Sequence, residues 1–101
     1  MKQTIDITPD ELRVIQEILK KFVPDYEVRA YGSRVNGRAK NTSDLDIVIM
    51  TDYPLDTMLY IDLKEELSES DLPFKVDITD WAKTSDTFKK IIDENSIVIF
   101  P

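Results

Sequence analysis

The clearest hydrophobic pattern lies between residues 8 and 22, where apolar side chains recur every three or four positions. This spacing places them along one face of a helix. Pro9 follows Thr8, and Glu11 stands three residues after Thr8, so Thr8 is expected to cap the helix in a capping box. The apolar face of this helix comprises Leu12, Ile15, Ile18, Leu19 and Phe22.

Shorter apolar runs elsewhere in the chain predict strands. Residues 27–31 alternate between apolar and polar side chains. Residues 45–50 form a nearly continuous apolar run, as expected of a central strand that is covered on both faces. We predict two further strands, at residues 74–78 and at residues 97–100.

Helical patterns separate these strands. Residues 55–69 return to helical spacing, and a last helix is expected to start at Ser85 or Asp86. The alternation of strands and helices predicts an α/β fold in a single domain spanning residues 1–101. The long helical connection between the second and third strands favours a parallel crossover, whereas the brief link between the first and second favours an antiparallel pair. We therefore expect a small mixed sheet with helices packed on it.

The composition narrows the chemistry, because the chain has no cysteine and no histidine. A Ser-His-Asp triad, a Cys-His pair and any thiolate or imidazole metal site are excluded. A catalytic base must then be a carboxylate, a lysine, a tyrosine or a metal-bound oxygen. Any metal must be held by oxygen, which points to magnesium, calcium or manganese.

The net charge of -7 argues against broad binding to nucleic acid, which requires a basic surface. Residues 28–43 nevertheless contain four basic residues and no acid, and this basic cluster suggests a local anion site. Its members are Arg29, Arg34, Arg38 and Lys40. No apolar run is long enough to span a membrane and no signal-peptide pattern is present, so we expect a cytoplasmic protein that makes no contact with a membrane.

Two acidic residues, Asp44 and Asp46, stand at the entry of the most hydrophobic strand. Residues two apart in a strand share a face, so these carboxylates project together while Leu45 and Ile47 point into the core. Such a pair repels unless a cation lies between its members, which suggests a metal site. The alternative is that Asp44 caps a turn and Asp46 is a solvated residue at the sheet edge.

Asp77 and the Gly32-Ser33 pair would extend this site. Asp77 lies on the polar side of the third predicted strand, where a third carboxylate could complete a cage for two divalent ions roughly 3.5–4 Å apart. Gly32 directly follows the first strand, and Ser33 is expected to open a short helical turn that Gly37 limits. Free N–H groups and the serine hydroxyl at such a turn can bind phosphate. An ordinary turn glycine followed by a capping serine is the alternative.

The combination of these features resembles the nucleotidyltransferase superfamily that includes DNA polymerase beta. Residues 31–49, YGSRVNGRAKNTSDLDIVI, look most like the minimal nucleotidyltransferases of bacteria and archaea. The third-acid strand KVDITDW adds to the resemblance, which covers the whole chain. It implies a polymerase beta-like nucleotidyltransferase fold.

The resemblance also implies roles for individual residues. Asp44 and Asp46 would hold two Mg²⁺ ions, or Mn²⁺, and Asp77 would complete the metal site and help to activate the acceptor hydroxyl. Gly32 and Ser33 would bind the triphosphate of ATP or another nucleoside triphosphate. In the same motif, Arg34 would contact phosphate, and Ser43 would serve nucleotide binding or orient Asp44. Arg38 and Lys40 receive no role. Tyr31 and Trp81 could stack on a base, but we interpret them as core or surface aromatics.

Minimal members of this superfamily are similar to antitoxins whose partner is an all-helical HEPN ribonuclease toxin. What the resemblance implies is transfer of AMP from ATP to a tyrosine hydroxyl of that partner, which silences it. We expect the partner, or a second copy of this chain, to supply the acceptor surface. The alternatives are a catalytically idle module that masks its partner, or an enzyme that modifies RNA or a small aminoglycoside-like antibiotic.

Overall fold

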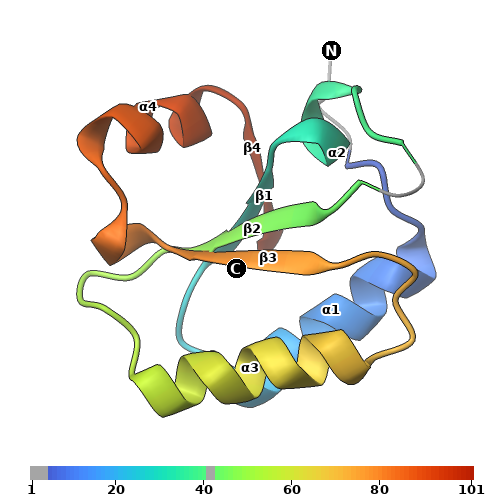
Figure 1. Ribbon diagram of the computed structural model, residues 1–101, viewed down its shortest axis with the longest axis horizontal. Coiled ribbons are helices and arrows are strands. Elements are labelled where there is room, and N and C mark those ends of the chain that lie inside the picture. Colours follow the sequence, from blue (N-terminus) through green and yellow to red (C-terminus); the bar gives the residue numbers. More distant parts are fainter. Residues whose placement is uncertain (1–4, 41–42) are drawn as a thin grey trace.

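The computed structural model of the protein describes residues 5–40 and 43–101. Strands and helices alternate along the chain, which confirms the predicted α/β fold (Figure 1). The elements, in order, are α1 (Pro9–Phe22), β1 (Val28–Tyr31), α2 (Ser33–Asn36), β2 (Leu45–Ile49), α3 (Thr57–Glu69), β3 (Val76–Asp80), the 3-10 turn η1 (Trp81–Lys83), α4 (Asp86–Glu94) and β4 (Ser96–Phe100).

The four strands form one mixed sheet in the order β3-β2-β1-β4. β1 pairs antiparallel with both β2 and β4, whereas β2 and β3 are parallel and are connected through α3. Both strand pairings expected from the connection lengths are therefore confirmed.

The helices lie on both sides of the sheet. α1 and α3 cover one face, and α2 and α4 lie on the other (Figure 1). Leu45, Ile47 and Ile49 of β2 belong to the hydrophobic core beneath α1 and α3. Val48 points the other way and is also fully buried, as is Ile92 of α4. β2 is thus covered on both faces, as its continuous apolar sequence indicated.

α1 begins where the sequence places it. The Glu11 N–H donates to Thr8 Oγ1 over 3.1 Å, and the Thr8 N–H donates to Glu11 Oε1 over 2.8 Å. This reciprocal pair satisfies N–H groups that the first helical turn leaves without backbone partners, and such a cap stabilises a helix by about 1 kcal/mol. In the described part of the chain, no helix is both long and apolar enough to cross a membrane.

Several element boundaries differ from the sequence prediction. α3 begins at Thr57 rather than at residue 55, because the Asp56 carboxylate caps it by accepting from the Leu59 N–H at 3.2 Å. β3 lies two residues later than predicted, at Val76–Asp80 instead of 74–78. A shift of two residues leaves every side chain on its expected face, whereas a shift of one would have reversed the faces. The smaller differences, at the ends of β1, β2 and β4, are of one residue each.

Candidate active site

Asp46 and Asp77 lie side by side on the parallel strands β2 and β3, where they are register partners. Register partners in adjacent strands share a face of the sheet. Asp44 is exposed and stands just before β2, two residues from Asp46. The sheet register therefore places Asp77 beside Asp46, which lies 31 positions earlier in the sequence.

The electrostatics of this group reflect the crowding of like charges. Burial raises the pKa of the Asp46 carboxyl above its ordinary value, and the charges of Asp77 and Asp44 raise that pKa further. A cation placed between the carboxylates would reverse the contribution of the charges. The donor set fits a divalent ion, because carboxylate oxygens are the ligands that magnesium and manganese prefer. Within residues 5–40 and 43–101 no three acidic side chains lie close enough together to form a complete metal-ligand set.

Gly32 is fitted against the Asp46 side chain. It adopts φ 82° and ψ −153° between β1 and α2, a conformation that residues with a side chain rarely adopt. A Cβ atom at this position would overlap Asp46 Oδ2. The sequence suggested that this glycine allows a phosphate to approach the backbone. In the structure, the absence of a side chain at Gly32 also leaves space for the Asp46 carboxylate.

The short helix α2 follows directly, and it begins at Ser33 as predicted. The Gly32 carbonyl accepts hydrogen bonds from the N–H groups of Val35 and Asn36, each at 3.0 Å. Gly37, with φ 80°, ends the helix as predicted, and its N–H donates to the Ser33 carbonyl. Four residues align few peptide dipoles, so phosphate binding at Ser33 would depend on individual N–H groups and the hydroxyl rather than on a helix dipole.

Arg34 is buried, with 6% of its surface exposed, and its guanidinium binds backbone carbonyls. Nε and Nη2 donate to the Ser43 carbonyl at 3.0 and 2.8 Å, and Nη1 donates to the Asp6 carbonyl at 2.8 Å. The guanidinium carbon also lies 4.2 Å from the centre of the Phe74 ring. The expected phosphate contact of Arg34 stays a prediction. Through its bonds to the Ser43 carbonyl, the Arg34 side chain connects α2 to the residue before Asp44.

Ser43, which directly precedes Asp44, is hydrogen-bonded to Lys40. Its hydroxyl accepts from the Lys40 N–H at 2.8 Å, and its own N–H donates to the Lys40 carbonyl at 3.0 Å. The basic cluster is correspondingly smaller at the surface than the sequence indicated. Arg29 forms ion pairs with Glu27 at 2.8 Å and with Asp93 at 3.5 Å, and Arg34 is internal. Of the four basic residues, Arg38 and Lys40 are left exposed.

Tyr31 borders the acid group from β1. Its hydroxyl shares a 2.7 Å hydrogen bond with Thr79 Oγ1 of β3, which ties the two strands across β2. Burial raises the pKa of the Tyr31 phenol, the hydrogen bond to Thr79 lowers it, and the charges of Asp46 and Asp77 raise it. The phenol therefore stays neutral at physiological pH. Trp81 lies outside this group, with the Lys89 ammonium 5.1 Å from its ring centre.

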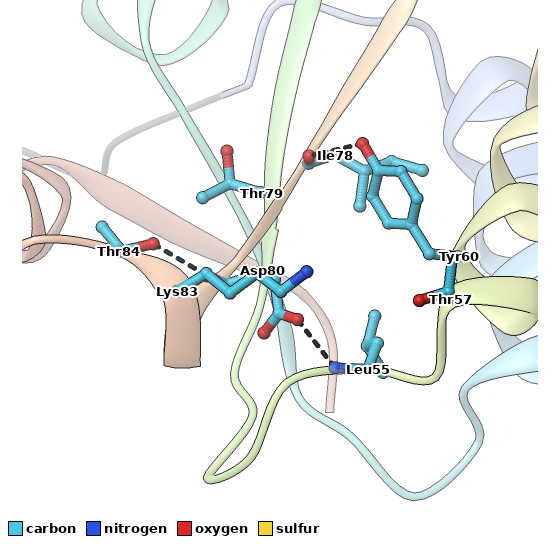
Figure 2. A pocket seen from close by; sticks show the side chains of 8 residues that line it. All are labelled: Leu55, Thr57, Tyr60, Ile78, Thr79, Asp80, Lys83 and Thr84. Atoms are coloured by element: carbon cyan, nitrogen blue, oxygen red, sulfur yellow. Dashed lines mark hydrogen bonds between the residues drawn. The ribbon is translucent and has the colours of Figure 1, made fainter.

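Asp80 is a buried acid to which the sequence interpretation gave no role. Its carboxylate accepts from the Leu55 N–H at 2.7 Å and from the hydroxyl of Thr51. Figure 2 shows it in a cavity of about 410 Å³ between β3 and the start of α3. There Tyr60 donates to the Ile78 carbonyl and Thr84 to the Asp80 carbonyl, so the polar groups largely bond to one another (Figure 2). Asp80 anchors the end of β3 and thereby fixes the strand that carries Asp77.

Asp46 and Asp77 on neighbouring strands, with Asp44 just before one of them and a Gly-Ser turn against Asp46, form the arrangement that is expected of a nucleotidyltransferase. Residues 13–101 match the family described as "Polymerase beta, Nucleotidyltransferase", and the chain belongs to this family. Enzymes of the family typically use a divalent metal. The chain is similar to the "Probable protein adenylyltransferase MntA" of Haemophilus influenzae, with 50% identity over 95 residues that cover 94% of this chain and 83% of the relative.

Solved structures with the same fold come from toxin-antitoxin complexes. One, described as a toxin-antitoxin with AMP-PNP, superimposes with a TM-score of 0.74 and 22% identity over 87% of this chain and 71% of that one. Another is a tri-AMPylated HEPN toxin of Shewanella oneidensis in complex with an MNT antitoxin. It has a TM-score of 0.68 and 21% identity, over 88% of this chain and 68% of that one. At these identities the similarity shows the fold alone.

Proposed function

We propose that this chain is a protein adenylyltransferase that moves AMP from ATP to a tyrosine hydroxyl of a HEPN-type toxin and so acts as its antitoxin. The observation that carries the proposal is the 50% identity with the probable protein adenylyltransferase of H. influenzae over nearly the whole chain. The names of the structural relatives agree with it, since they include an AMPylated HEPN toxin bound to its antitoxin.

Each site residue then has a task. Asp44 and Asp46 would hold two Mg²⁺ ions, or Mn²⁺, and Asp77 would complete the set. Gly32 and Ser33 bind the triphosphate through the backbone and the serine hydroxyl. Arg34 and Ser43 contribute to the nucleotide site by fixing the turn before Asp44, as their contacts with each other and with Lys40 suggest.

The reaction is an in-line displacement at the α-phosphorus of ATP. The tyrosine oxygen forms a bond to this phosphorus, the bond to the oxygen that bridges to the β-phosphorus breaks, and pyrophosphate leaves. Asp77 is exposed on β3, where an incoming hydroxyl can reach it, and its carboxylate takes the phenolic proton. Bound divalent ions would supply positive charge to the attacking and leaving oxygens.

The charge of the chain suits such a partner. A ribonuclease toxin requires a basic surface to hold RNA, and a protein of net charge -7 gains association rate and specificity against it. The same charge disfavours RNA as the acceptor. We place the reaction in the cytoplasm, where ATP and the RNA targets of such a toxin are found, and expect a hetero-oligomer of the two proteins.

The test is to incubate the purified chain with magnesium, ATP labelled at the α-phosphate and its co-encoded HEPN-type neighbour. Label should appear on the neighbour's band and should be lost when the acceptor tyrosine is changed to phenylalanine. Asp44→Asn should abolish labelling without preventing co-purification, because Asp44 is proposed to serve the chemistry and not the interface. Asp62→Asn on the exposed surface of α3 is the matched control and should label normally.

Two outcomes would contradict the proposal. If the toxin is neutralised equally well by Asp44→Asn and carries no label, the chain acts by masking its partner. If label appears only on added RNA or on an aminoglycoside, the acceptor is not a protein.

A further inference from the structure

A cavity of about 350 Å³ opens directly beside the acid group, between α2 and α4. Gly32 and Asp46 both line it, so a molecule in this cavity adjoins the proposed triphosphate and metal site. Its volume lies within the range of small-molecule pockets in proteins, which are mostly apolar with a few polar groups that fix orientation.

The wall of the cavity opposite the acids comes from α4, and it is apolar. Phe88 and Ile91 line the cavity, and 37% and 55% of their surfaces are exposed. Ile92, the next residue, is fully buried. The apolar side of α4 therefore extends beyond the part that the sheet covers, and the excess faces the cavity.

Phe88 is held in a fixed orientation at this wall. Its ring meets the Tyr31 ring edge to face, with the ring centres 5.8 Å apart and the planes at 81°. Tyr31 is itself fixed by its hydrogen bond to Thr79. An aromatic ring that is braced on one side and partly exposed on the other is suited to stack on a planar group.

The polar residues of the lining argue against a phosphate and for a base. Among residues 5–40 and 43–101, no lysine or arginine lines the cavity, and Asp46 is the charged residue of that lining, so a polyphosphate would meet repulsion there. Asn36 and Asn95 also line the cavity, and the Asn36 side-chain oxygen accepts a hydrogen bond from the Arg38 N–H at 3.1 Å. An asparagine amide matches the N6 and N7 edge of adenine, whereas guanine is more often read by arginine or lysine.

We propose that this cavity binds the adenine base of the donor nucleotide, with Phe88 as the stacking platform. The inference rests on the proposed function, because it assumes that a nucleoside triphosphate occupies the acid site. The ring of an acceptor tyrosine is the competing occupant. The position of Gly32 in the lining favours the base, because the proposed function assigns Gly32 to the phosphates of the same nucleotide.

The experiment measures binding of a non-hydrolysable ATP analogue and of inorganic tripolyphosphate, both with magnesium, to the full chain. Base stacking on an aromatic ring is worth about 1–3 kcal/mol, so Phe88→Ala should weaken the ATP analogue roughly five- to hundredfold. Tripolyphosphate has no base and should bind Phe88→Ala as it binds the wild type. Met58→Ala, at an exposed residue of α3 on the other side of the sheet, is the control and should change neither. Phe88→Leu keeps the apolar bulk without the aromatic face and replaces Phe88→Ala if that variant melts early.

The outcomes separate this inference from the proposed function. If Phe88→Ala and Phe88→Leu bind the ATP analogue as tightly as the wild type, the base lies elsewhere while the proposed function stands. If the KM of the acceptor protein rises and ATP affinity does not change, the acceptor ring fills the cavity and the inference is wrong. Equal wild-type affinity for ATP and GTP analogues would overturn the adenine assignment. If the wild type binds neither the ATP analogue nor tripolyphosphate, the proposed function fails as well.

Discussion

Gly32 and Gly37 are the two glycines of the chain, and both have a positive φ, of 82° and 80°. They differ in their surroundings. A Cβ atom at Gly37 would meet nothing within 4 Å, whereas one at Gly32 would overlap the Asp46 carboxylate. Gly37 is therefore required only by its backbone conformation. Gly32 is required both by its backbone conformation and by the space that the Asp46 side chain occupies.

This difference makes Gly37→Ala a natural control for Gly32→Ala. Gly37→Ala should destabilise the fold by about 1–2 kcal/mol, which is the cost of a left-handed backbone for alanine, and AMP transfer should persist. Gly32→Ala should destabilise the fold more and also displace Asp46, so transfer should fall far below the level of Gly37→Ala. Urea unfolding and the labelling assay measure the two effects. Equal transfer rates in the two variants would show that Asp46 does not depend on the space at Gly32.

At the scale of elements, the Arg34 side chain connects segments of the chain that no helix or strand pairing joins. Through one guanidinium, α2 is joined to the residue before Asp44, to the segment before α1 and to the Phe74 ring before β3. These three segments lie outside the helices and strands, and the segment before α1 is also held by the Asp6 N–H, which donates to the Arg34 carbonyl at 2.7 Å. The position of Asp44 thus depends on a side chain that does not itself need to touch the substrate.

Arg34→Lys tests this positioning role. Lysine keeps the charge but has a single ammonium group, which cannot reproduce the fork on the Ser43 carbonyl together with the bond to Asp6. We expect a loss of about 1.5–3 kcal/mol in unfolding free energy and a fall in kcat that exceeds any change in the KM for ATP. Arg38→Lys, at an exposed residue of the same segment, should leave both unchanged. A rise in the KM for ATP with a normal kcat would instead indicate that Arg34 contacts the nucleotide.

For the molecule as a whole, the acid group is a source of instability when no cation is bound. The Asp46 pKa is raised in the folded state above 3.8, first by burial and then by Asp77 and Asp44. A raised carboxyl pKa means that the folded state binds the proton more tightly than the unfolded state does, so the charge of Asp46 lowers stability at neutral pH. This penalty is full above the folded-state pKa and disappears as the pH falls toward 3.8.

Asp46→Asn should therefore stabilise the metal-free protein at neutral pH, and its advantage over the wild type should shrink as the pH is lowered. Urea unfolding in the presence of a chelator, followed from about pH 8 to about pH 4, measures the difference between the two proteins. Asp62→Asn removes one negative charge outside the site and controls for net charge. An advantage of Asp46→Asn that grows as the pH falls would contradict the assignment of the repulsion to Asp46.

Local patterns in the sequence were enough to predict most of the elements. The Thr8–Glu11 box, the apolar run of β2 and the two glycines around α2 each act within a few residues, and each appears in the structure as expected. Both ends of β3 were misplaced by two residues because they depend on partners far away in the sequence. The start is the point where Val76 pairs with Leu45 of β2, and at the end Asp80 binds Thr51 and Leu55. The face that carries Asp77 was still predicted, since the alternation of side chains survives a shift of two residues.

The sequence by itself determined the chemistry that is available to this protein. Without histidine and cysteine, any metal ligand has to be an oxygen and any base a carboxylate, a lysine, a tyrosine or a metal-bound oxygen, and strand periodicity predicts that Asp44 and Asp46 share a face. Only the tertiary structure decided which charges remain available at the surface. Arg29 and Arg34 have the same formal charge as Arg38, but Arg29 is paired with acids and Arg34 is buried against carbonyls.

The tertiary structure also decided that Phe88 and Ile91, which have helical core spacing, face an open cavity beside Asp46. A periodic pattern fixes which side of a helix is apolar, whereas the width of the surface that covers it is set by how the other elements pack.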